Sequence, residues 1–345
     1  MDIKQPLLMH INNSVFLNDD VLVMIDRRYL PNKKIELLAA NYEEVAQAIE
    51  NMVVQGAGDI AITAGYGLYL AALEAERNTN YSIEEARALI LTAKQRLVKT
   101  RPTGRHLAAL LNKMVKNINW EKTRWSSQIL QSINASIEKQ QKRSELTGKW
   151  ASELLCDGDS ILTHCFPGAA LLYMLVFARE QGKKVEVICT ETRPYLQGAR
   201  LTAWSVSELG IPVTLISDNM AAYCMNQGMI SKVFAAADRI AMDGTVANKI
   251  GTFQLALAAQ YHKLPFYILG YGGPDKNCRA GKDIVIEHRD PREVLSINGI
   301  SISSENVKGF YPAFDLTRPE LITGIITDRG IVPPSQVERY WDLPY

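Results

Sequence analysis

The second half of the chain alternates short apolar runs with stretches of helical periodicity, and this alternation constrains the fold more than any other feature. The apolar runs begin at Asp157 and have the length of strands. Their sequences are DSILTHC, KVEVICTE, IPVTLISD, KVFAAADRIA and PFYILG. Strands that alternate with helices predict a parallel sheet covered on both faces, because a parallel connection needs a crossover segment. We therefore expect an α/β, Rossmann-like domain over residues 157–345.

The first part of the chain predicts a smaller, mainly helical domain that carries a short β-sheet. Two short strands are expected around the turn at residues 31–33, within DDVLVMIDRRYLPNKKIELLAA. In NYEEVAQAIENMVVQG, Asn41 is the expected N-cap of a helix and Gly56 its expected stop. Ser82 and Glu85 form a possible capping box at the start of a further helix.

Length and charge agree with a globular protein of about two domains. The chain has 345 residues and a net charge of +1, so we expect no nucleic-acid partner. No apolar run approaches the roughly 18 residues of a membrane span, and the start lacks a signal-peptide pattern, so we expect a cytoplasmic protein without a membrane partner. The expected limits are 1–130 for the N-terminal domain, 131–156 for a helical connector and 157–345 for the Rossmann-like domain.

The five cysteines are scattered and form no CxxC pair, so neither a disulfide framework nor a metal site is expected. No GxGxxG or GxxxxGK[ST] pattern occurs, which counts against a dinucleotide or Walker-type site, and we expect no cofactor. We expect Cys165 to lie in a cleft and Cys156, Cys189 and Cys224 to be more buried.

Polar residues or glycines follow every apolar run of the second half. Ligands of parallel sheets bind beyond the carboxyl ends of the strands, so this convergence predicts a site there. The residues concerned are Cys165, segment 190–200, Asp218-Asn219, Asp238-Arg239 and the loop 270–277. Each has a simpler alternative: a packed thiol for Cys165, a helix cap for Asp218-Asn219, a local ion pair for Asp238-Arg239 and an ordinary turn for the glycines.

Long segments of the chain resemble the methylthioribose-1-phosphate isomerase family. That family is related to ribose-1,5-bisphosphate isomerase and to the regulatory subunits of the translation-initiation guanine-nucleotide exchange factor. The segments are ETRPYLQGARLTAWSVSELG, AAADRIAMDGTVANKIGTFQ, VVQGAGDIAITAGYG, KTRPTGRHL and FDLTRPELITGIITDRGIVPP. The resemblance covers nearly the whole chain. It implies an aldose–ketose isomerase acting on a pentose 1-phosphate, most simply 5-methylthioribose 1-phosphate in methionine salvage, and a homodimer.

The resemblance also implies roles for particular residues. Cys165 matches the catalytic cysteine, acting as a base or transition-state stabiliser, and Asp238 matches the acid/base. The implied substrate-binding residues are Gln197, Asn248 and Lys249 in the second part, and Arg101 with the triplet Gln55, Gly56 and Ala57 in the first.

The chain departs from the family pattern around the expected substrate. Gln55 stands where the family has a phosphate-binding arginine, and Asp59 enters a region that is usually neutral. Phe166 follows the catalytic cysteine, Arg105 is an added cation, and the loop 270–277 is altered. Three alternatives therefore stay open: an isomerase of 5-deoxyribose 1-phosphate, an isomerase of ribose 1,5-bisphosphate, or a non-catalytic protein resembling the exchange-factor subunits.

Overall fold

The computed structural model describes residues 5–101, 105–121 and 124–344, in two compact units. The N-terminal unit is His10–Gln141, and the C-terminal unit runs from Lys142 onward and includes the segment that ends at Met9. Helix α5 (Trp125–Ser152) begins in the first unit and ends in the second. The expected connector 131–156 falls largely within α5, and the expected domain limits stay a prediction.

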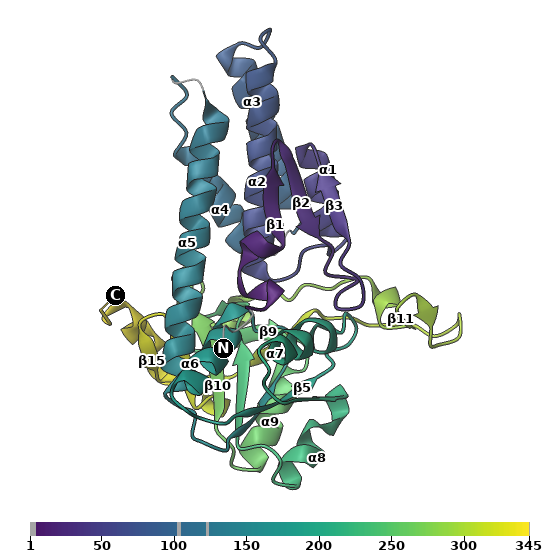
Figure 1. Ribbon diagram of the computed structural model, residues 1–345, viewed down its shortest axis with the longest axis vertical. Helices are drawn as coiled ribbons and strands as arrows, with labels where there is room; N and C mark the ends of the chain where they lie inside the picture. Colours follow the sequence, from purple (N-terminus) through teal and green to yellow (C-terminus); the bar gives the residue numbers. More distant parts are fainter. Residues whose placement is uncertain (1–4, 102–104, 122–123, 345) are drawn as a thin grey trace. The chain divides into compact units, whose positions relative to one another are not determined.

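The C-terminal unit is built on a seven-stranded sheet, which confirms the predicted Rossmann-like class (Figure 1). All neighbouring strands pair in parallel except β14 and β15, which are antiparallel. In spatial order the strands are β15 (Gly330–Val332), β14 (Gly324–Thr327), β10 (Phe266–Tyr271), β7 (Lys232–Ala236), β4 (Ser160–Thr163), β5 (Glu186–Thr190) and β6 (Val213–Ile216).

Helices cover both faces of the sheet. Successive residues of a strand point to opposite faces, so each strand contributes to both cores. Ile161 of β4 belongs to the core that includes α6, and Leu162 to the core that includes α8 and α9. The covering helices are α6 (Ala169–Glu180), the π-helix η3 (Gly198–Ala203) continued by α7 (Trp204–Glu208), α8 (Ala221–Asn226) and α9 (Thr252–Tyr261). Buried apolar runs of this kind are what made the strands predictable from sequence.

One prediction about this unit was wrong. The run KVFAAADRIA, expected as one strand, divides into β7 and β8 (Arg239–Ile240), with Asp238 close to the break. Asn248-Lys249 belong to β9 (Val246–Lys249), which pairs with β8 and β13 (Phe314–Thr317). Helix α9 cannot begin before Gly251, whose φ of 105° lies in the left-handed region.

The N-terminal unit consists of a three-stranded antiparallel sheet and helices. The strands are β1 (Val15–Asn18), β2 (Val21–Ile25) and β3 (Glu36–Ala39), and the helices are α1 (Tyr42–Glu50), α2 (Ala57–Arg77), α3 (Ile83–Lys99), α4 (Arg105–Lys116) and the first part of α5. The N-cap Asn41 and the capping box of Ser82 and Glu85 are confirmed. Gly56 was wrongly predicted as a stop, because α1 ends at Glu50 and Gly56 is the N-cap of α2.

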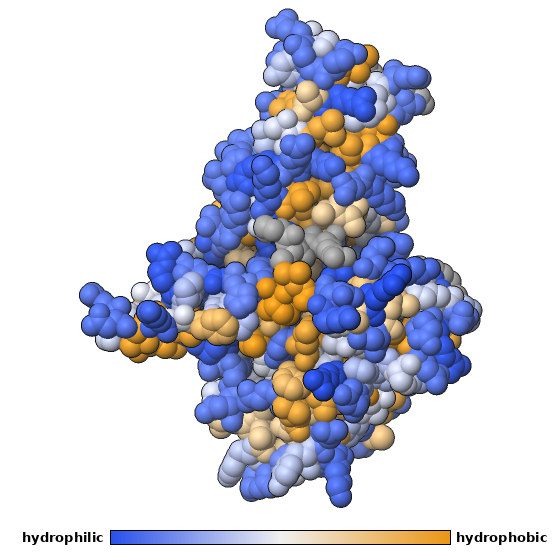
Figure 2. Space-filling model, turned by 180° about the vertical axis from the view of Figure 1, so that it is seen from behind, coloured by the Kyte–Doolittle hydropathy of each residue, from blue (hydrophilic) through white to orange (hydrophobic). Residues whose placement is uncertain are grey.

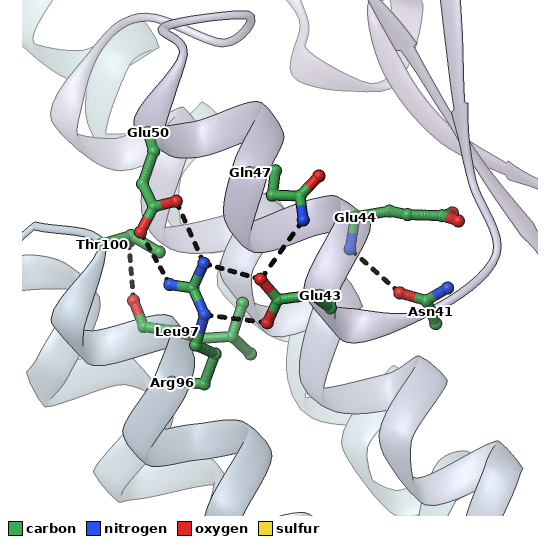
Figure 3. A network of polar contacts seen from close by, with 8 residues as sticks. All are labelled: Asn41, Glu43, Glu44, Gln47, Glu50, Arg96, Leu97 and Thr100. Atoms are coloured by element: carbon green, nitrogen blue, oxygen red, sulfur yellow. Dashed lines mark hydrogen bonds and ion pairs between the residues drawn. The ribbon is translucent and has the colours of Figure 1, made fainter.

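Arg96 joins two helices of the N-terminal unit (Figure 3). From α3, its guanidinium lies 2.8 Å from the Glu43 carboxylate and 2.7 Å from the Glu50 carboxylate, both on α1. These bonds raise the pKa of Arg96 and lower that of Glu43. Since all three side chains are partly exposed, the pairs add only modestly to stability.

Short segments complete the structure. The hairpin β11 (Ser296–Ile297) and β12 (Ile300–Ser301) belongs to the C-terminal unit. The 3-10 turns are η1 (Leu7–Met9), η2 (Ile11–Asn13), η4 (Asp218–Met220), η5 (Gly281–Asp283), η6 (Pro291–Glu293), η7 (Pro319–Leu321) and η8 (Pro334–Trp341). Within the described residues, no helix has both the length and the apolar character needed to cross a membrane.

Candidate active site

Cys165 follows β4 in a left-handed backbone conformation (φ 60°), which is uncommon for a residue with a side chain. Its N–H donates to Thr192 Oγ1 over 2.9 Å, and its carbonyl oxygen accepts a hydrogen bond from Thr202 Oγ1. Thr192 lies just after β5, and Thr202 lies in η3. Two threonine hydroxyls therefore fix the peptide groups on either side of Cys165, as a strained backbone at a functional position requires.

Lys249, the last residue of β9, is almost completely buried (4% exposed). Its Nζ donates to Tyr311 Oη over 2.7 Å and to the Ala313 carbonyl oxygen over 3.2 Å. The Tyr311 ring centroid lies 5.0 Å from Nζ, and the rings of Tyr195 and Phe314 lie 5.8 and 5.9 Å away. Hydrogen bonds and aromatic faces thus replace the water that a lysine ammonium normally keeps.

The Cys165 thiol lies in a desolvated setting. Burial raises the pKa of Cys165 to about 11. The positive charges of Lys249 and Arg289 act to lower this pKa, while the carboxylate of Asp238 acts to raise it. The thiol is therefore protonated at neutral pH, and two cations and one carboxylate are close enough to influence it. The structure thus brings Cys165, Asp238 and Lys249 into one group.

Asp238 is held at the bend between β7 and β8. Its backbone N–H donates to the Ala247 carbonyl oxygen over 2.9 Å, which ties the bend to β9. The neighbouring Arg239 pairs with Asp275, the two side chains being joined by a 3.0 Å hydrogen bond from Nε. The ion pair considered for Asp238 and Arg239 is thus replaced by one between Arg239 and Asp275.

Two predicted substrate-binding amides lie in the same unit. Gln197 is buried, and among the described residues its Oε1 has no hydrogen-bond partner. Asn248, beside Lys249, donates from Nδ2 to Thr252 Oγ1 over 2.9 Å. Because a buried polar atom without a partner is costly, a hydroxyl group of a ligand would satisfy Gln197.

Three residues of this group were not predicted as site residues: Tyr195, Arg289 and Tyr311. The Arg289 guanidinium lies 5.2 Å from the Tyr195 ring centroid, and Tyr195 Oη donates to Glu293 over 2.6 Å. Burial raises the pKa of Tyr195 to about 12. Tyr195 falls in a segment that was expected at a strand end, whereas Arg289 and Tyr311 lie in a stretch without periodicity that gave no signal.

The loops around Cys165 are held by side chains from neighbouring strand ends. Asp218, considered a helix cap, accepts the N–H groups of Thr192 and Arg193, each over 2.7 Å. Tyr271, the last residue of β10 and part of the altered segment 270–277, donates its hydroxyl to the Pro167 carbonyl oxygen in the altered turn after Cys165. Two of the departures from the family pattern are therefore in direct contact.

The N-terminal unit brings its own predicted residues together around Met52. Gln55 Nε2 donates to the Met52 carbonyl oxygen over 3.2 Å, and Arg101 Nη1 lies 3.2 Å from Met52 Sδ. Gly56, with φ 99°, is the N-cap of α2, and Ala57 is its first residue. The amino end of a long helix beside a guanidinium is suited to a phosphate group.

Arg27 contacts both Gln55 and Asp59, two positions of this unit that depart from the family pattern. Its side chain is 1% exposed, donates to the Gln55 carbonyl oxygen, and lies 2.7 Å from Asp59 Oδ2. Gln140 donates to the other carboxylate oxygen of Asp59 over 2.7 Å. The added carboxylate in the first turn of α2 is thus neutralised by a buried guanidinium. The side chain of Arg105, the other added cation, lies outside the described part of the chain.

The cysteines and possible metal ligands complete the inventory. Cys165 is partly exposed, Cys189, Cys224 and Cys278 are buried, and Cys156 is exposed. The prediction that Cys156 is more buried than Cys165 was therefore wrong, because Cys156 lies in the loop between α5 and β4. Among the described residues, no three histidine, cysteine or acidic side chains are grouped so as to hold a metal ion.

The fold and this group of residues define a two-unit α/β protein with a partly exposed cysteine at a strand end. Comparison with known proteins adds the family: the model of the Initiation factor 2 subunit family matches residues 53–334. The methylthioribose-1-phosphate isomerase of Fervidobacterium nodosum is 42% identical over 93% of this chain and 94% of its own length. The putative methylthioribose-1-phosphate isomerase of Methanocaldococcus jannaschii is 40% identical over 92% of this chain and 93% of its own length.

Solved structures agree. The 5-methylthioribose 1-phosphate isomerase of Pyrococcus horikoshii superimposes with a TM-score of 0.83 at 35% identity, covering 99% of this chain and 98% of that one. The translation initiation factor eIF-2B subunit delta of A. fulgidus superimposes with a TM-score of 0.78 at 37% identity. The match covers 93% of this chain and 96% of that one. The chain belongs to the Initiation factor 2 subunit family. Within it, the chain is an isomerase.

The desolvated thiol predicts a distinctive pH dependence of alkylation. In a Cys156→Ser background, the rate of Cys165 modification should rise about tenfold per pH unit from pH 7 to pH 10, because only the thiolate reacts and its pKa is raised. Peptide mapping after iodoacetamide treatment measures this rate, and the additional Cys165→Ser change identifies the signal. A plateau below pH 9 would contradict the raised pKa.

Proposed function

We propose that the chain converts a pentose 1-phosphate, in the first place 5-methylthioribose 1-phosphate, into the corresponding ketose 1-phosphate in methionine salvage. The observation that carries the proposal is the group formed by Cys165, Asp238 and the buried Lys249, in which the charges of Lys249 and Asp238 act on the thiol. The names of the relatives support the same substrate.

The chemistry explains why these groups are needed. The anomeric oxygen of an aldose 1-phosphate is esterified, so the sugar is locked as a ring until its ring oxygen is protonated. Asp238 is the proposed acid for this step and the base for its reverse. Hydrogen must then move from C2 to C1, either as a proton through an enediol or as a hydride. Cys165 is the proposed base of the proton route, or the group that stabilises the reacting centre.

The binding groups have separate proposed tasks. Arg101 and the amino end of α2, with Gln55, Gly56 and Ala57, are suited to the phosphate group. Gln197 and Asn248 are suited to sugar hydroxyls, because each presents a buried amide. Lys249 provides a positive charge beside the thiol, where negative charge develops if an enediolate forms.

A non-catalytic role, by analogy with the translation-factor structure, is the second candidate. A protein without catalysis has no need to desolvate a thiol beside two cations, so we favour the enzyme. The alternatives 5-deoxyribose 1-phosphate and ribose 1,5-bisphosphate concern the substrate and leave the reaction type unchanged.

The first prediction tests the catalytic pair. Cys165→Ser and Asp238→Asn should each lower kcat by about 10²-fold or more, the range for loss of a positioned acid–base group. A panel of the three named pentose phosphates, with detection of the ketose, measures turnover. Circular dichroism should show an unchanged fold, because both changes are nearly isosteric. Wild-type turnover in either variant would remove that residue from the mechanism, and no turnover of any substrate by the wild-type protein would favour the non-catalytic role.

The second prediction tests substrate choice at the amino end of α2. Gln55 carries no charge, and Asp59 adds a negative charge that Arg27 balances. If the phosphate binds here, Gln55→Arg should lower KM for 5-methylthioribose 1-phosphate about tenfold or more, since a charge-assisted contact adds about 1.5–3 kcal/mol. Gln55→Lys serves as the matched control, because it adds charge without a bidentate fork. Equal KM values in all three proteins would place the phosphate elsewhere.

A homodimer is supported by apolar surface on the C-terminal unit. Helices α8 and α9, which pack against each other, expose Tyr223, Leu257 and Tyr261, and the edge strand β6 exposes Leu215. Apolar side chains also reach the surface in the view of Figure 2. Exposed apolar groups that gather on adjoining elements mark an interaction surface, and a second copy of the chain is the proposed partner. The cytoplasmic location stays a prediction.

The third prediction tests this surface. Leu257→Glu should shift the protein from dimer to monomer in sedimentation equilibrium, because a buried, unpaired carboxylate opposes association. Ile300→Glu, at an exposed apolar position on the separate hairpin strand β12, is the control and should leave the mass unchanged. A monomeric wild-type protein, or a dimer that survives Leu257→Glu, would contradict the proposed interface.

A further inference from the structure

His164 is a fully buried imidazole that joins two separate strand ends of the C-terminal unit. It immediately precedes Cys165 and is 2% exposed. Its Nδ1 lies 2.6 Å from Thr190 Oγ1, at the end of β5. Its Nε2 lies 2.9 Å from the carbonyl oxygen of Ile250, the residue that follows Lys249. One ring therefore connects the backbone beside the thiol to the backbone beside the buried ammonium.

The partners decide which ring nitrogen carries the proton. A carbonyl oxygen only accepts hydrogen bonds, so Nε2 must donate to Ile250. Burial lowers the pKa of His164, and the nearby charge of Lys249 lowers it further, while Asp218 acts in the opposite direction. In the neutral ring Nδ1 is then the acceptor, and the Thr190 hydroxyl is its donor. The ring orientation is thus fixed at both ends.

The turn after Lys249 is shaped to receive this ring. A Cβ atom on Gly251 would lie 3.0 Å from His164 Cε1, and the φ of Gly251 is 105°, so a side chain is disfavoured there for two reasons. On the same turn, Asp315 accepts the Gly251 N–H over 2.7 Å and the Phe253 N–H over 3.1 Å. Asp315 therefore holds the turn by accepting two N–H groups of the turn, and His164 holds it by donating to the Ile250 carbonyl oxygen.

We propose that His164 is a positioning residue that sets the place of Lys249 relative to the Cys165 thiol, through its Nε2–H bond to Ile250. It touches no substrate in this role. The inference rests on the proposed catalytic role of Cys165 only for its effect on turnover. Its effect on the thiol is independent of any substrate, because Lys249 already acts on Cys165 in the ligand-free protein.

Two substitutions separate positioning from packing. The Nε2 of glutamine can occupy the place of the imidazole Nε2, whereas the shorter asparagine side chain reaches only the place of Nδ1. Both His164→Gln and His164→Asn are prepared in the Cys156→Ser background. Thr190→Val, which keeps the side-chain shape but removes the hydroxyl that fixes Nδ1, gives a milder perturbation of the same link.

The primary measurement is the pH profile of Cys165 alkylation by iodoacetamide. His164→Asn should slow alkylation at pH 8.5 about 3- to 10-fold, because displacement of Lys249 raises the thiol pKa further by about half a unit to one unit. His164→Gln should stay within about twofold of the parent, and Thr190→Val should fall between them. In turnover, His164→Asn should lower kcat about 10²-fold with little change in KM, since misplacement of a catalytic group mainly affects the chemical step.

The outcomes distinguish the two proposals. Equal alkylation profiles for His164→Asn and His164→Gln would overturn the positioning role, even if Cys165→Ser is inactive. The expected alkylation difference together with an active Cys165→Ser variant would uphold the link and refute the catalytic role of the thiol. Should the His164 variants fail to fold, as thermal melting would show, an unchanged alkylation profile in Thr190→Val would overturn the proposal by itself.

Discussion

Removal of water from the end of β4 is the constraint on which the other features of the candidate site depend. A thiol in that setting is held protonated, and an ammonium there must find other partners. The ammonium of Lys249 finds these partners in the Tyr311 hydroxyl, the Ala313 carbonyl oxygen and the aromatic rings around it. Two threonine hydroxyls hold the strained backbone of Cys165 in place. The need to replace lost hydration therefore determines where these polar residues lie, and their catalytic tasks come second.

This arrangement clarifies the proposed division of labour. A thiol with a pKa of about 11 is a poor base until a substrate alters its surroundings, so its proton is available as a hydrogen-bond donor when the substrate binds. The carboxyl group of Asp238, at the bend between β7 and β8, is the second proton-transfer group of the proposal.

The sequence predicted the fold class and a convergence of polar residues, Cys165 and Asp238 among them, because buried parallel strands leave continuous apolar runs and their ends meet at one edge. The expected role of Lys249 came from the family resemblance alone. The sequence did not predict that Lys249 lies in a strand. Pairing of β9 with β13 depends on residues more than 60 positions apart, and no local pattern reports it. Arg289 and Tyr311 were missed for the same reason, since long-range packing alone brings their irregular segment to the site.

The ion pair of the buried Arg27 and the partly buried Asp59 limits which substitutions this part of the chain tolerates. Loss of either partner alone would leave an uncompensated charge in the interior, at a cost of about 3–5 kcal/mol, which is comparable with the whole stability of many domains. A single substitution at either position is therefore strongly disfavoured. Joint replacement by well-packed apolar residues removes both charges at once and avoids that cost. Arg27 and Asp59 thus act as one unit, and any redesign of the first turn of α2 has to keep both or replace both.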